Sequence, residues 1–147
     1  MRKLLLVSLV AMMALAGCGE IMDSYYPTSK EAVSDGAIKR GWVPGFLATG
    51  ASEIREAHDL DTNGVIVACK MSDPELSALL ARSQKIEKMG DFAPALSLNR
   101  HWWPKAFREG NYEQLSNEGF WFLSMKDDQR TWFAAVNSTS GQVYLWQ

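Results

Sequence analysis

Residues that usually carry chemistry are scarce in this chain, which has only two cysteines and two histidines among its 147 residues. The sequence contains no H-E-x-x-H, paired C-x-x-C, G-x-S-x-G, G-x-G-x-x-G or P-loop pattern. These patterns are typical of zinc sites, serine hydrolases and phosphate-binding loops. We therefore predict no catalytic residue and no cofactor, and we expect a protein that is not an enzyme.

An excess of positive charge is also missing. The chain has 15 basic and 17 acidic residues, for a net charge of -2. Nucleic-acid binding depends on a clustered basic surface, so this partner class is not expected. No repeat, heptad pattern or low-complexity block interrupts the sequence, and 47% of its residues are hydrophobic. A chain of this length and composition has the apolar content for one globular core.

The longest apolar run is too short to cross a bilayer. It covers residues 4–17, is interrupted only by Ser8, and follows the basic start Met1-Arg2-Lys3. A helix of 14 residues does not span a hydrocarbon core of ~30 Å, but it fits the apolar region of a secretory signal. The run ends in Leu15-Ala16-Gly17-Cys18, which resembles the lipobox of bacterial lipoproteins. In that class a diacylglycerol is attached to the cysteine and the chain is cleaved just before it.

This resemblance makes Cys18 a predicted lipidation site, the alternative being an ordinary secretory signal with an incidental cysteine. Two or three acyl chains on one residue anchor a protein far more firmly than one. The resemblance implies a bacterial cell-envelope protein, and Gly19 in place of an aspartate favours the outer membrane, facing the periplasm. Removing residues 1–17 would take away two of the 15 basic residues and none of the 17 acidic ones, for a net charge of -4.

We divide the chain into a signal peptide at residues 1–17, a lipidated tether at 18–26 and one α+β domain at 27–147. The capping-box pattern Thr28-Ser29-Lys30-Glu31 predicts a first helix ending at Gly41. Asp73-Pro74-Glu75 opens a second helix that we expect to continue to Gly90. Two or three helices are expected to pack on one face of a small antiparallel sheet.

The strands are predicted from β-branched and alternating runs. Residues 65–71 form the clearest one, with Val65, Val67, Cys69 and Met71 pointing inward and Lys70 outward. The short polar connections between 119–125, 131–137 and 142–146 favour antiparallel hairpins. Residues 52–59 fit either a helical or a strand period.

A second resemblance depends on motifs in the first half of the chain. They are Tyr26-Pro27-Thr28, Asp35-Gly36-Ala37-Ile38, Arg40-Gly41-Trp42-Val43-Pro44, Phe46-Leu47, Ala51-Ser52, Ile54 and His58-Asp59-Leu60-Asp61-Thr62-Asn63, with Trp102-Trp103-Pro104 and Tyr144-Leu145-Trp146 also in keeping. Over roughly residues 26–70 the chain thus resembles the small bacterial lipoproteins of the YbbD head-domain family. The resemblance implies lipoprotein status and the fold; it implies no catalytic residues, and it favours a strand at 52–59.

The segment from Asp59 to Gly64 matches the first half of a calcium loop, with oxygen ligands at Asp59, Asp61 and Asn63. The twelfth position of the loop should be a glutamate, but here it is Lys70, which repels a cation. The alternative is a tight turn in which the Asp and Asn side chains bind their own backbone. A small-ligand or calcium-binding module at residues 58–63 is accordingly our second functional hypothesis.

Other candidate site residues are aromatic or titratable. His58 lies beside Asp59 and Asp61, the arrangement of a base oriented by a carboxylate. Glu53 and Glu56 resemble a glycosidase pair, although two exposed charges are the commoner arrangement. Cys69 is expected to be a small buried hydrophobe. Of the six tryptophans, we assign Trp102, Trp103, Trp121 and Trp132 to the core and choose Trp42 and Trp146 as possible contacts for a partner or ligand.

From these observations the first functional hypothesis is a lipid-anchored envelope protein of unknown molecular activity. It would act by interaction with the membrane through Cys18 and with another envelope protein or peptidoglycan, and not with nucleic acid.

Overall fold

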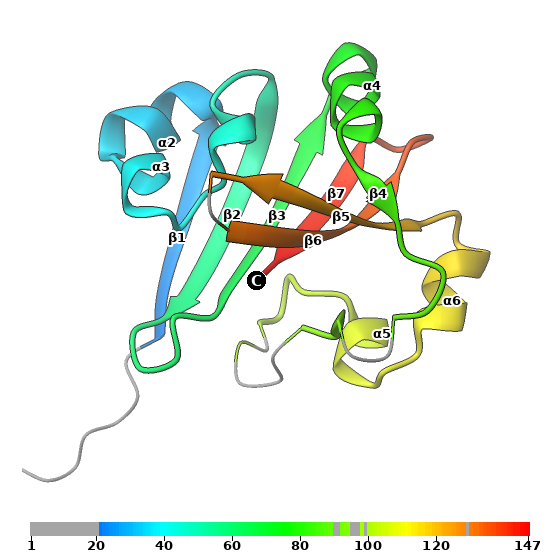
Figure 1. Cartoon of the computed structure of the whole chain (residues 1–147). Coiled ribbons are helices and arrows are strands. Elements are labelled where there is room, and N and C mark those ends of the chain that lie inside the picture. The colour runs from blue at the N-terminus through cyan, green and yellow to red at the C-terminus, as the bar shows by residue number, and fades with distance from the viewer. Residues whose placement is uncertain (1–20, 90–91, 95–97, 99, 129) are drawn as a thin grey trace, which may run out of the picture.

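The computed structural model describes residues 21–147 apart from 90–91, 95–97, 99 and 129 (Figure 1). The predicted signal peptide and Cys18 lie outside the described residues. Seven strands form one sheet in the order β1-β2-β3-β7-β6-β5-β4, and each neighbouring pair is antiparallel. The strands are β1 (Ile21–Thr28), β2 (Ala51–Asp59), β3 (Val65–Met71), β4 (Gln84–Lys85), β5 (Trp121–Asp127), β6 (Arg130–Asn137) and β7 (Gln142–Trp146). The predicted antiparallel sheet is confirmed, and residues 52–59 are strand.

The helices of the described chain are short. They are α2 (Ser29–Asp35), α3 (Ala37–Arg40), the 3₁₀ turn η1 (Gly45–Leu47), α4 (Asp73–Ala81), α5 (Lys105–Arg108) and α6 (Tyr112–Asn117). The first predicted helix is divided at Gly36, whose φ of 82° is left-handed and ends α2. At its start the Thr28 hydroxyl donates to the Glu31 carboxylate, and no side chain caps the backbone amides. The capping box is therefore only partly formed.

The second predicted helix is shorter than expected. It ends at Ala81 and is followed by β4, which pairs with β5 at Gln84↔Ser124 and Lys85↔Leu123. The helix period continued to Ile86 in the sequence, but here the chain joins the edge of the sheet, where β5 supplies backbone hydrogen bonds. Among the described residues no helix is long and apolar enough to cross a membrane.

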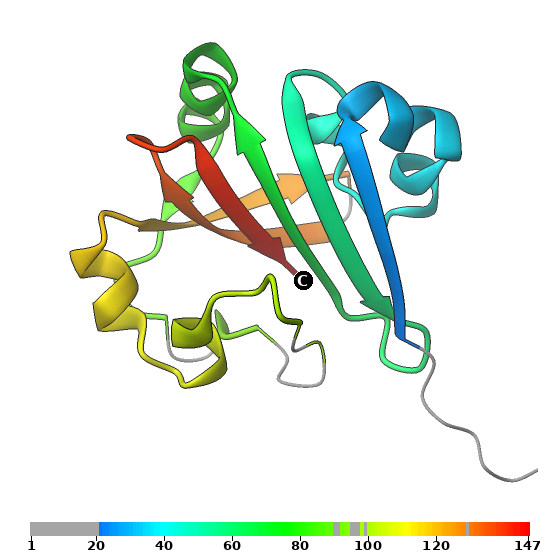
Figure 2. The same cartoon turned by 180° about the vertical axis from the view of Figure 1, so that it is seen from behind.

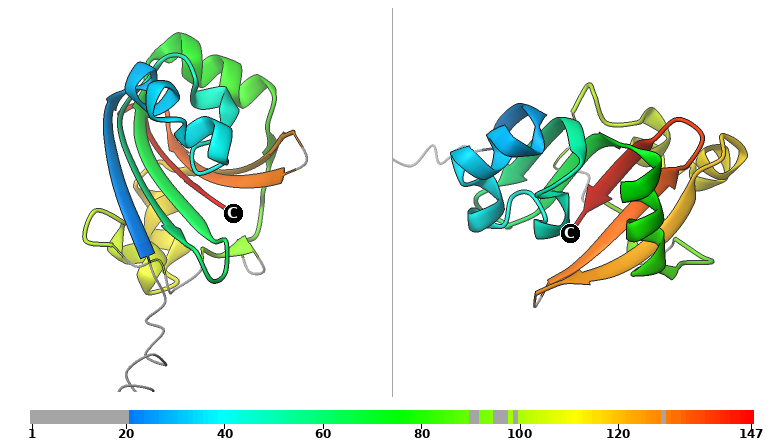
Figure 3. Two further views of the ribbon diagram at one scale, coloured as in Figure 1. Left: turned by 90° about the vertical axis from the view of Figure 1, so that its left-hand side faces the viewer. Right: turned by 90° about the horizontal axis from the view of Figure 1, so that it is seen from above.

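The sheet twists and curls so strongly that β5 and β6 run across the direction of β1, β2 and β3 (Figures 1 and 3). Alternate residues of its strands therefore contribute to two buried clusters. The inner cluster joins the inward residues of β3, from Val65 to Met71, to α2, α3 and α4 and to Leu123 and Trp132 of the crossing strands. The predicted inward face of β3 is confirmed.

The second cluster covers the opposite face of the sheet, so the prediction that helices pack on one face only is wrong. It joins Ile66 and Trp146 to Trp103 and Phe107 of the segment that carries α5, with Leu115 of α6 (Figure 2). In β3 even Ile66 and Ala68 are buried, at 0% and 5% exposed. Period-2 alternation does not reveal this second layer, because a strand covered on both faces is apolar throughout.

Residues 21–26 differ from the expected tether. They belong to β1, which pairs with β2 from Ile21↔Asp59 to Thr28↔Ser52. The sheet therefore begins only three residues after Cys18. The polar sequence of this segment is explained by its position at the sheet edge, where half of its side chains are exposed.

Candidate functional site

The most unusual group of side chains lies on β2, on the inner face of the sheet. Ile54 packs in the inner cluster and Ala57 in the second cluster, on the opposite face of the sheet. Because side chains alternate along a strand, Glu56 and His58 point inward with Ile54. Both are buried, Glu56 at 0% and His58 at 2% exposed. Two ionisable groups thus lie on the apolar side of the sheet.

Glu56 and His58 contact each other directly. Glu56 Oε1 lies 2.6 Å from His58 Nδ1, within hydrogen-bonding distance. The other atom of each group, Glu56 Oε2 and His58 Nε2, is buried with no partner among the described residues. A buried polar atom without a partner destabilises a fold by about 1–3 kcal/mol, so the pair is retained at a penalty that the rest of the core must offset.

Burial shifts both pKa values toward the neutral forms. It raises the pKa of Glu56 from 4.5 to about 8; the negative charges of Asp23 and Asp35 act in the same direction, whereas the Ser24 hydroxyl and Arg40 oppose it. Burial also lowers the pKa of His58 below 6.5, helped by the positive charge of Arg40. The pair therefore holds one proton between its two groups at neutral pH.

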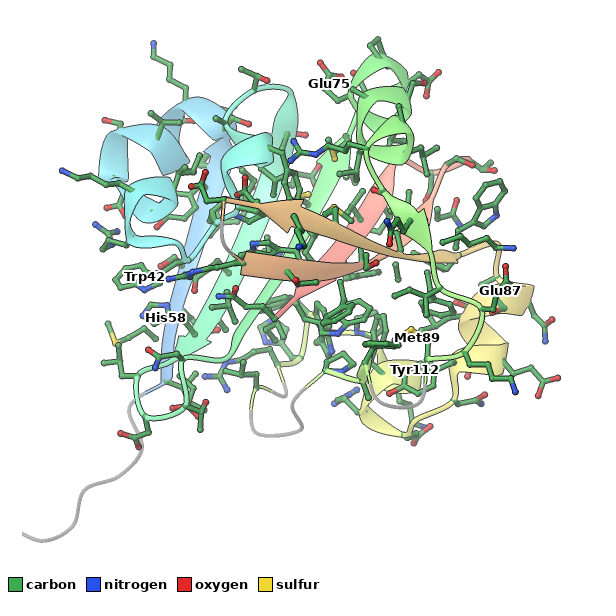
Figure 4. All side chains as sticks on the ribbon, viewed as in Figure 1. Trp42, His58, Glu75, Glu87, Met89 and Tyr112 are labelled. Carbon is green, nitrogen blue, oxygen red and sulfur yellow. The ribbon has the colours of Figure 1, made fainter. Side chains whose placement is uncertain are left out.

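Trp42 covers the imidazole of His58. The two rings stack with centroids 3.8 Å apart and an interplanar angle of 17°, and Figure 4 shows the two side chains next to each other near the β1 edge of the sheet. The Arg40 guanidinium lies 4.1 Å from the Trp42 ring centroid, on which it makes a cation–π contact. Trp42 is only half-buried. Trp42 therefore contacts both the imidazole of His58 and the guanidinium of Arg40.

Asp35 fixes Arg40 in this position. Arg40 Nη1 donates to the Asp35 backbone oxygen at 2.8 Å and Nη2 pairs with its carboxylate. The Tyr26 hydroxyl of β1 donates to the same carboxylate at 2.9 Å. These bonds hold the pKa of Asp35 below its usual value. A column of contacts thus runs from Tyr26 through Asp35, Arg40 and Trp42 to His58, joining β1, the α2–α3 segment and β2.

The predicted calcium half-loop is the tight turn between β2 and β3. Asp59 Oδ1 accepts hydrogen bonds from the amides of Asp61 at 2.8 Å and Thr62 at 3.3 Å. The Asp61 amide lowers the pKa of Asp59. Asn63 has a left-handed φ of 58°, and its amide donates to the Asp59 backbone oxygen at 2.8 Å. The Asp59 carboxylate is thus already engaged by its own backbone, which is the alternative geometry that the sequence allowed.

The structure brings some predicted residues together and separates others. It places Trp42 against His58. Successive positions put His58 and Asp59 on opposite faces of β2, and Asp61 is exposed at the turn. The three titratable residues that we grouped as a base with its orienting carboxylates therefore do not share one cleft.

The tryptophan assignments need two corrections. Trp146 is only 2% exposed and its Nε1 donates to the Phe92 backbone oxygen at 2.5 Å, so it belongs to the second buried cluster and not to a contact surface. Trp121, which we assigned to the core, is 56% exposed at the first position of β5. Trp103 and Trp132 are buried as predicted.

The burial of Glu56 is the feature of this site that sequence reasoning missed. We grouped it with Glu53 as an exposed charge. Glu53 is indeed exposed and pairs with Lys70 at 2.9 Å, but Glu56 is fully buried. The available signal was the alternation Ile54, Glu56, His58, which places the carboxyl and the imidazole on one face once residues 51–59 are recognised as strand.

A second feature is a charged hollow of about 380 Å³ between α3, the segment before η1 and the β5–β6 turn. Arg130 Nη1 donates to the Gly41 backbone oxygen at 3.0 Å, and the Asp127 carboxylate accepts from the Gly45 amide. Lys39 and Asp128 also line the hollow. Charged groups of both signs are thus available to a polar partner there.

A comparison with curated proteins and with solved structures finds no match. The family models give one. Residues 20–68, which extend from just before β1 to within β3, match the model described as YbbD head domain. This range contains the whole column from Tyr26 to His58, the buried Glu56 and the β2–β3 turn. The chain therefore resembles the YbbD head-domain family over this segment, as its sequence motifs indicated.

Proposed function

We propose that this chain is a lipid-anchored protein of the bacterial cell envelope whose domain acts by binding a partner. The observation that carries the proposal is the sequence Leu15-Ala16-Gly17-Cys18, placed three residues before the first strand of the domain. Cleavage before Cys18 and acylation of its thiol would leave the folded domain directly attached to lipid. Gly19 after the anchor supports the outer membrane as its location.

A binding role is supported by the way the candidate site is built. The carboxyl of Glu56 is used by His58, that of Asp59 by the turn backbone, and that of Asp35 by Arg40 and Tyr26. These groups stabilise the geometry of β1, β2 and the α2–α3 segment. We propose that this framework presents a recognition surface, with the hollow beside Lys39 as its polar part, to another envelope protein or to peptidoglycan.

The anchor is tested by mass spectrometry of the protein purified from membranes. We expect the mature chain to begin at Cys18 and to carry acyl chains. A mature chain whose first residue is unmodified would refute the anchor. The Cys18→Ala variant is the matched control, because it keeps every residue of the described domain and loses only the acceptor thiol.

The binding role is tested by crosslinking in cells. A photo-reactive residue in place of Lys39, at the rim of the hollow, is compared with one in place of Lys105 on α5. We expect a partner to be captured from position 39 in the native anchor background and to be lost with Cys18→Ala. Sedimentation with purified peptidoglycan separates the two partner classes. Equal capture from both positions would contradict a recognition surface at the hollow.

A further inference from the structure

One end of the sheet lies next to the point where the chain enters the domain. β1 begins at Ile21, which pairs with Asp59 at the end of β2. The β2–β3 turn of residues 60–64 follows immediately, so it emerges beside the first residue of β1. Figures 1 and 2 show the start of β1 and this turn at the same end, whereas α4 lies at the other end of β3.

Covalent geometry limits how far this end can lie from an anchor on Cys18. Three Cα–Cα steps separate Cys18 from Ile21, and at ~3.8 Å each they reach no more than about 11 Å. The headgroup layer of a bilayer is ~5–8 Å thick on each side of the hydrocarbon core. By contrast, the eight residues of β1 extend over about 26 Å. An acylated Cys18 therefore holds the start of β1 at the membrane surface and the far end of the strand away from it.

The surface chemistry of this end fits a lipid interface. Met22 is 43% exposed and Leu60 is 49% exposed, so two large apolar side chains reach the surface at this end. Met22 pairs in register with His58 of β2, and Leu60 follows two residues later as the first residue of the turn, so the two lie at the same end of the sheet. Nearby, the carboxylate of Asp23 is neutralised by Arg100, whose Nε lies 2.8 Å from each of its oxygens.

The opposite end carries a polar turn. Residues 138–141 connect β6 to β7, and the Asn137 side chain accepts from the amides of Thr139 and Ser140 at 3.0 Å. The Gly141 amide and carbonyl are bonded to Asn137 and Met71. Met71 is the last residue of β3, which places this turn one full strand away from the β2–β3 turn. Both turns are polar, but the β6–β7 turn has no exposed large apolar side chain to match Leu60, and it lies farther from Cys18.

We propose that the start of β1 and the β2–β3 turn form a membrane-contacting rim, with Met22 and Leu60 inserted among the lipid headgroups. The partner is the bilayer that holds the acyl chains, and the inference rests on the proposed anchoring through Cys18. Contact at the rim orients the domain with β1, β2 and β3 rising from the surface. The hollow beside Lys39 and the β6–β7 turn then remain open to the periplasm.

The test uses the full lipidated protein in vesicles of phosphatidylethanolamine and phosphatidylglycerol. A single cysteine is introduced as Leu60→Cys or, as the matched control, Ser138→Cys, and is labelled with an environment-sensitive dye. Cys69 does not compete for the label, since it is 1% exposed. Brominated lipids in the headgroup-proximal region of the bilayer then quench dyes that lie within it.

We expect quenching at position 60 to exceed that at position 138 by at least twofold. Equal quenching at the two positions would contradict the proposal that the rim contacts the membrane. Hydrogen exchange of the unlabelled protein gives an independent measurement that does not depend on either variant. Vesicles should slow exchange in residues 60–64 relative to detergent and leave residues 138–141 unchanged, and an unchanged rate in 60–64 would also overturn the rim.

Flotation of the vesicles separates this inference from the proposal on which it rests. If the protein does not float with the vesicles, the anchor itself is refuted and the rim with it. If the protein floats but both positions are quenched equally, the anchor stands and the rim is wrong. The double variant Met22→Ser and Leu60→Ser should float as the native protein does, because acylation is intact, but should lose the exchange protection of residues 60–64.

Discussion

The buried Glu56–His58 pair makes stability depend on pH in a way that can be worked out from its two pKa shifts. Burial raises the pKa of Glu56 from 4.5 to about 8 and lowers the pKa of His58 below 6.5. A raised pKa in the folded state gives a stabilising contribution that is complete below pH 4.5 and is lost as the pH rises toward 8. A lowered pKa gives a contribution that is complete above pH 6.5 and is lost as the pH falls through the folded value of His58.

Above pH 6.5 the glutamate contribution changes most. Unfolded glutamate is deprotonated there, and unfolded histidine, half protonated at pH 6.5, loses its remaining protons as the pH rises, whereas the folded pair keeps one proton up to about pH 8. Each pH unit over which the folded state holds one extra proton lowers the free energy of unfolding by about 1.4 kcal/mol. Between pH 6.5 and 8 the loss is therefore at most about 2 kcal/mol. Below pH 6.5 the two contributions oppose each other until His58 reaches its own pKa.

The assay is urea unfolding of the full chain at several pH values between 6.5 and 8, with thermal unfolding as a second measurement. For a domain of this size about 2 kcal/mol corresponds to a decrease of about 4–8 °C in Tm. The variant Glu56→Gln keeps the shape and offers an amide to His58 Nδ1, but it binds no titrating proton. We expect its stability to be nearly flat over this pH range.

Glu53→Gln is the matched control, because Glu53 is exposed on the same strand and pairs with Lys70. This variant should keep the full pH dependence of the native chain. If Glu56→Gln and the native chain show the same slope between pH 6.5 and 8, the extra proton is not held by Glu56 and the reasoning fails.

Three further predictions concern the fold around the site. Gly141 has a φ of 72°, and a Cβ at this position would lie only 2.6 Å from the Met71 backbone oxygen. Gly141→Ala should therefore lower the free energy of unfolding in urea by more than the control Gly110→Ala, whose φ is 66° but whose Cβ meets no atom within 4 Å. The control should lose about 1 kcal/mol, and equal losses would contradict the clash. Burial raises the pKa of Cys69 to about 12, so its thiol should react with a disulfide reagent only at the rate of unfolding, and rapid labelling of the folded protein would refute its burial. Millimolar calcium should leave the Tm unchanged, because the Asp59 carboxylate accepts backbone amides, and a rise in Tm that Asp59→Asn abolishes would restore the calcium hypothesis.

Local patterns predicted the parts of the fold whose causes are local. The β-branched run of residues 65–71 forms β3 with Lys70 outward, and the short polar connections join β5, β6 and β7 as antiparallel neighbours. The turn at Asp59 is equally local, since its hydrogen bonds lie within five residues. The resemblance of residues 20–68 to the YbbD head domain was also visible in the sequence motifs.

The site itself depends on contacts between distant residues. The site forms because the sheet curls and the α2–α3 segment places Trp42 and Arg40 beside its inner face, 14 and 16 residues before Glu56 in the sequence. The alternation of residues along β2 does not predict that Trp42 and Arg40 cover this part of the strand.

The contrast between local patterns and contacts of distant residues also explains which of our predictions were wrong. By itself the sequence determined most strands and showed the lipobox-like motif that ends at Cys18, because each of these depends on neighbouring residues. Only the tertiary structure decided that residues 21–26 belong to the sheet, that Trp146 is buried while Trp121 is exposed, and that one carboxyl and one imidazole lie 2.6 Å apart inside the core. Burial is set by which distant surfaces meet, and a one-dimensional pattern carries that information only where a single face of an element is covered.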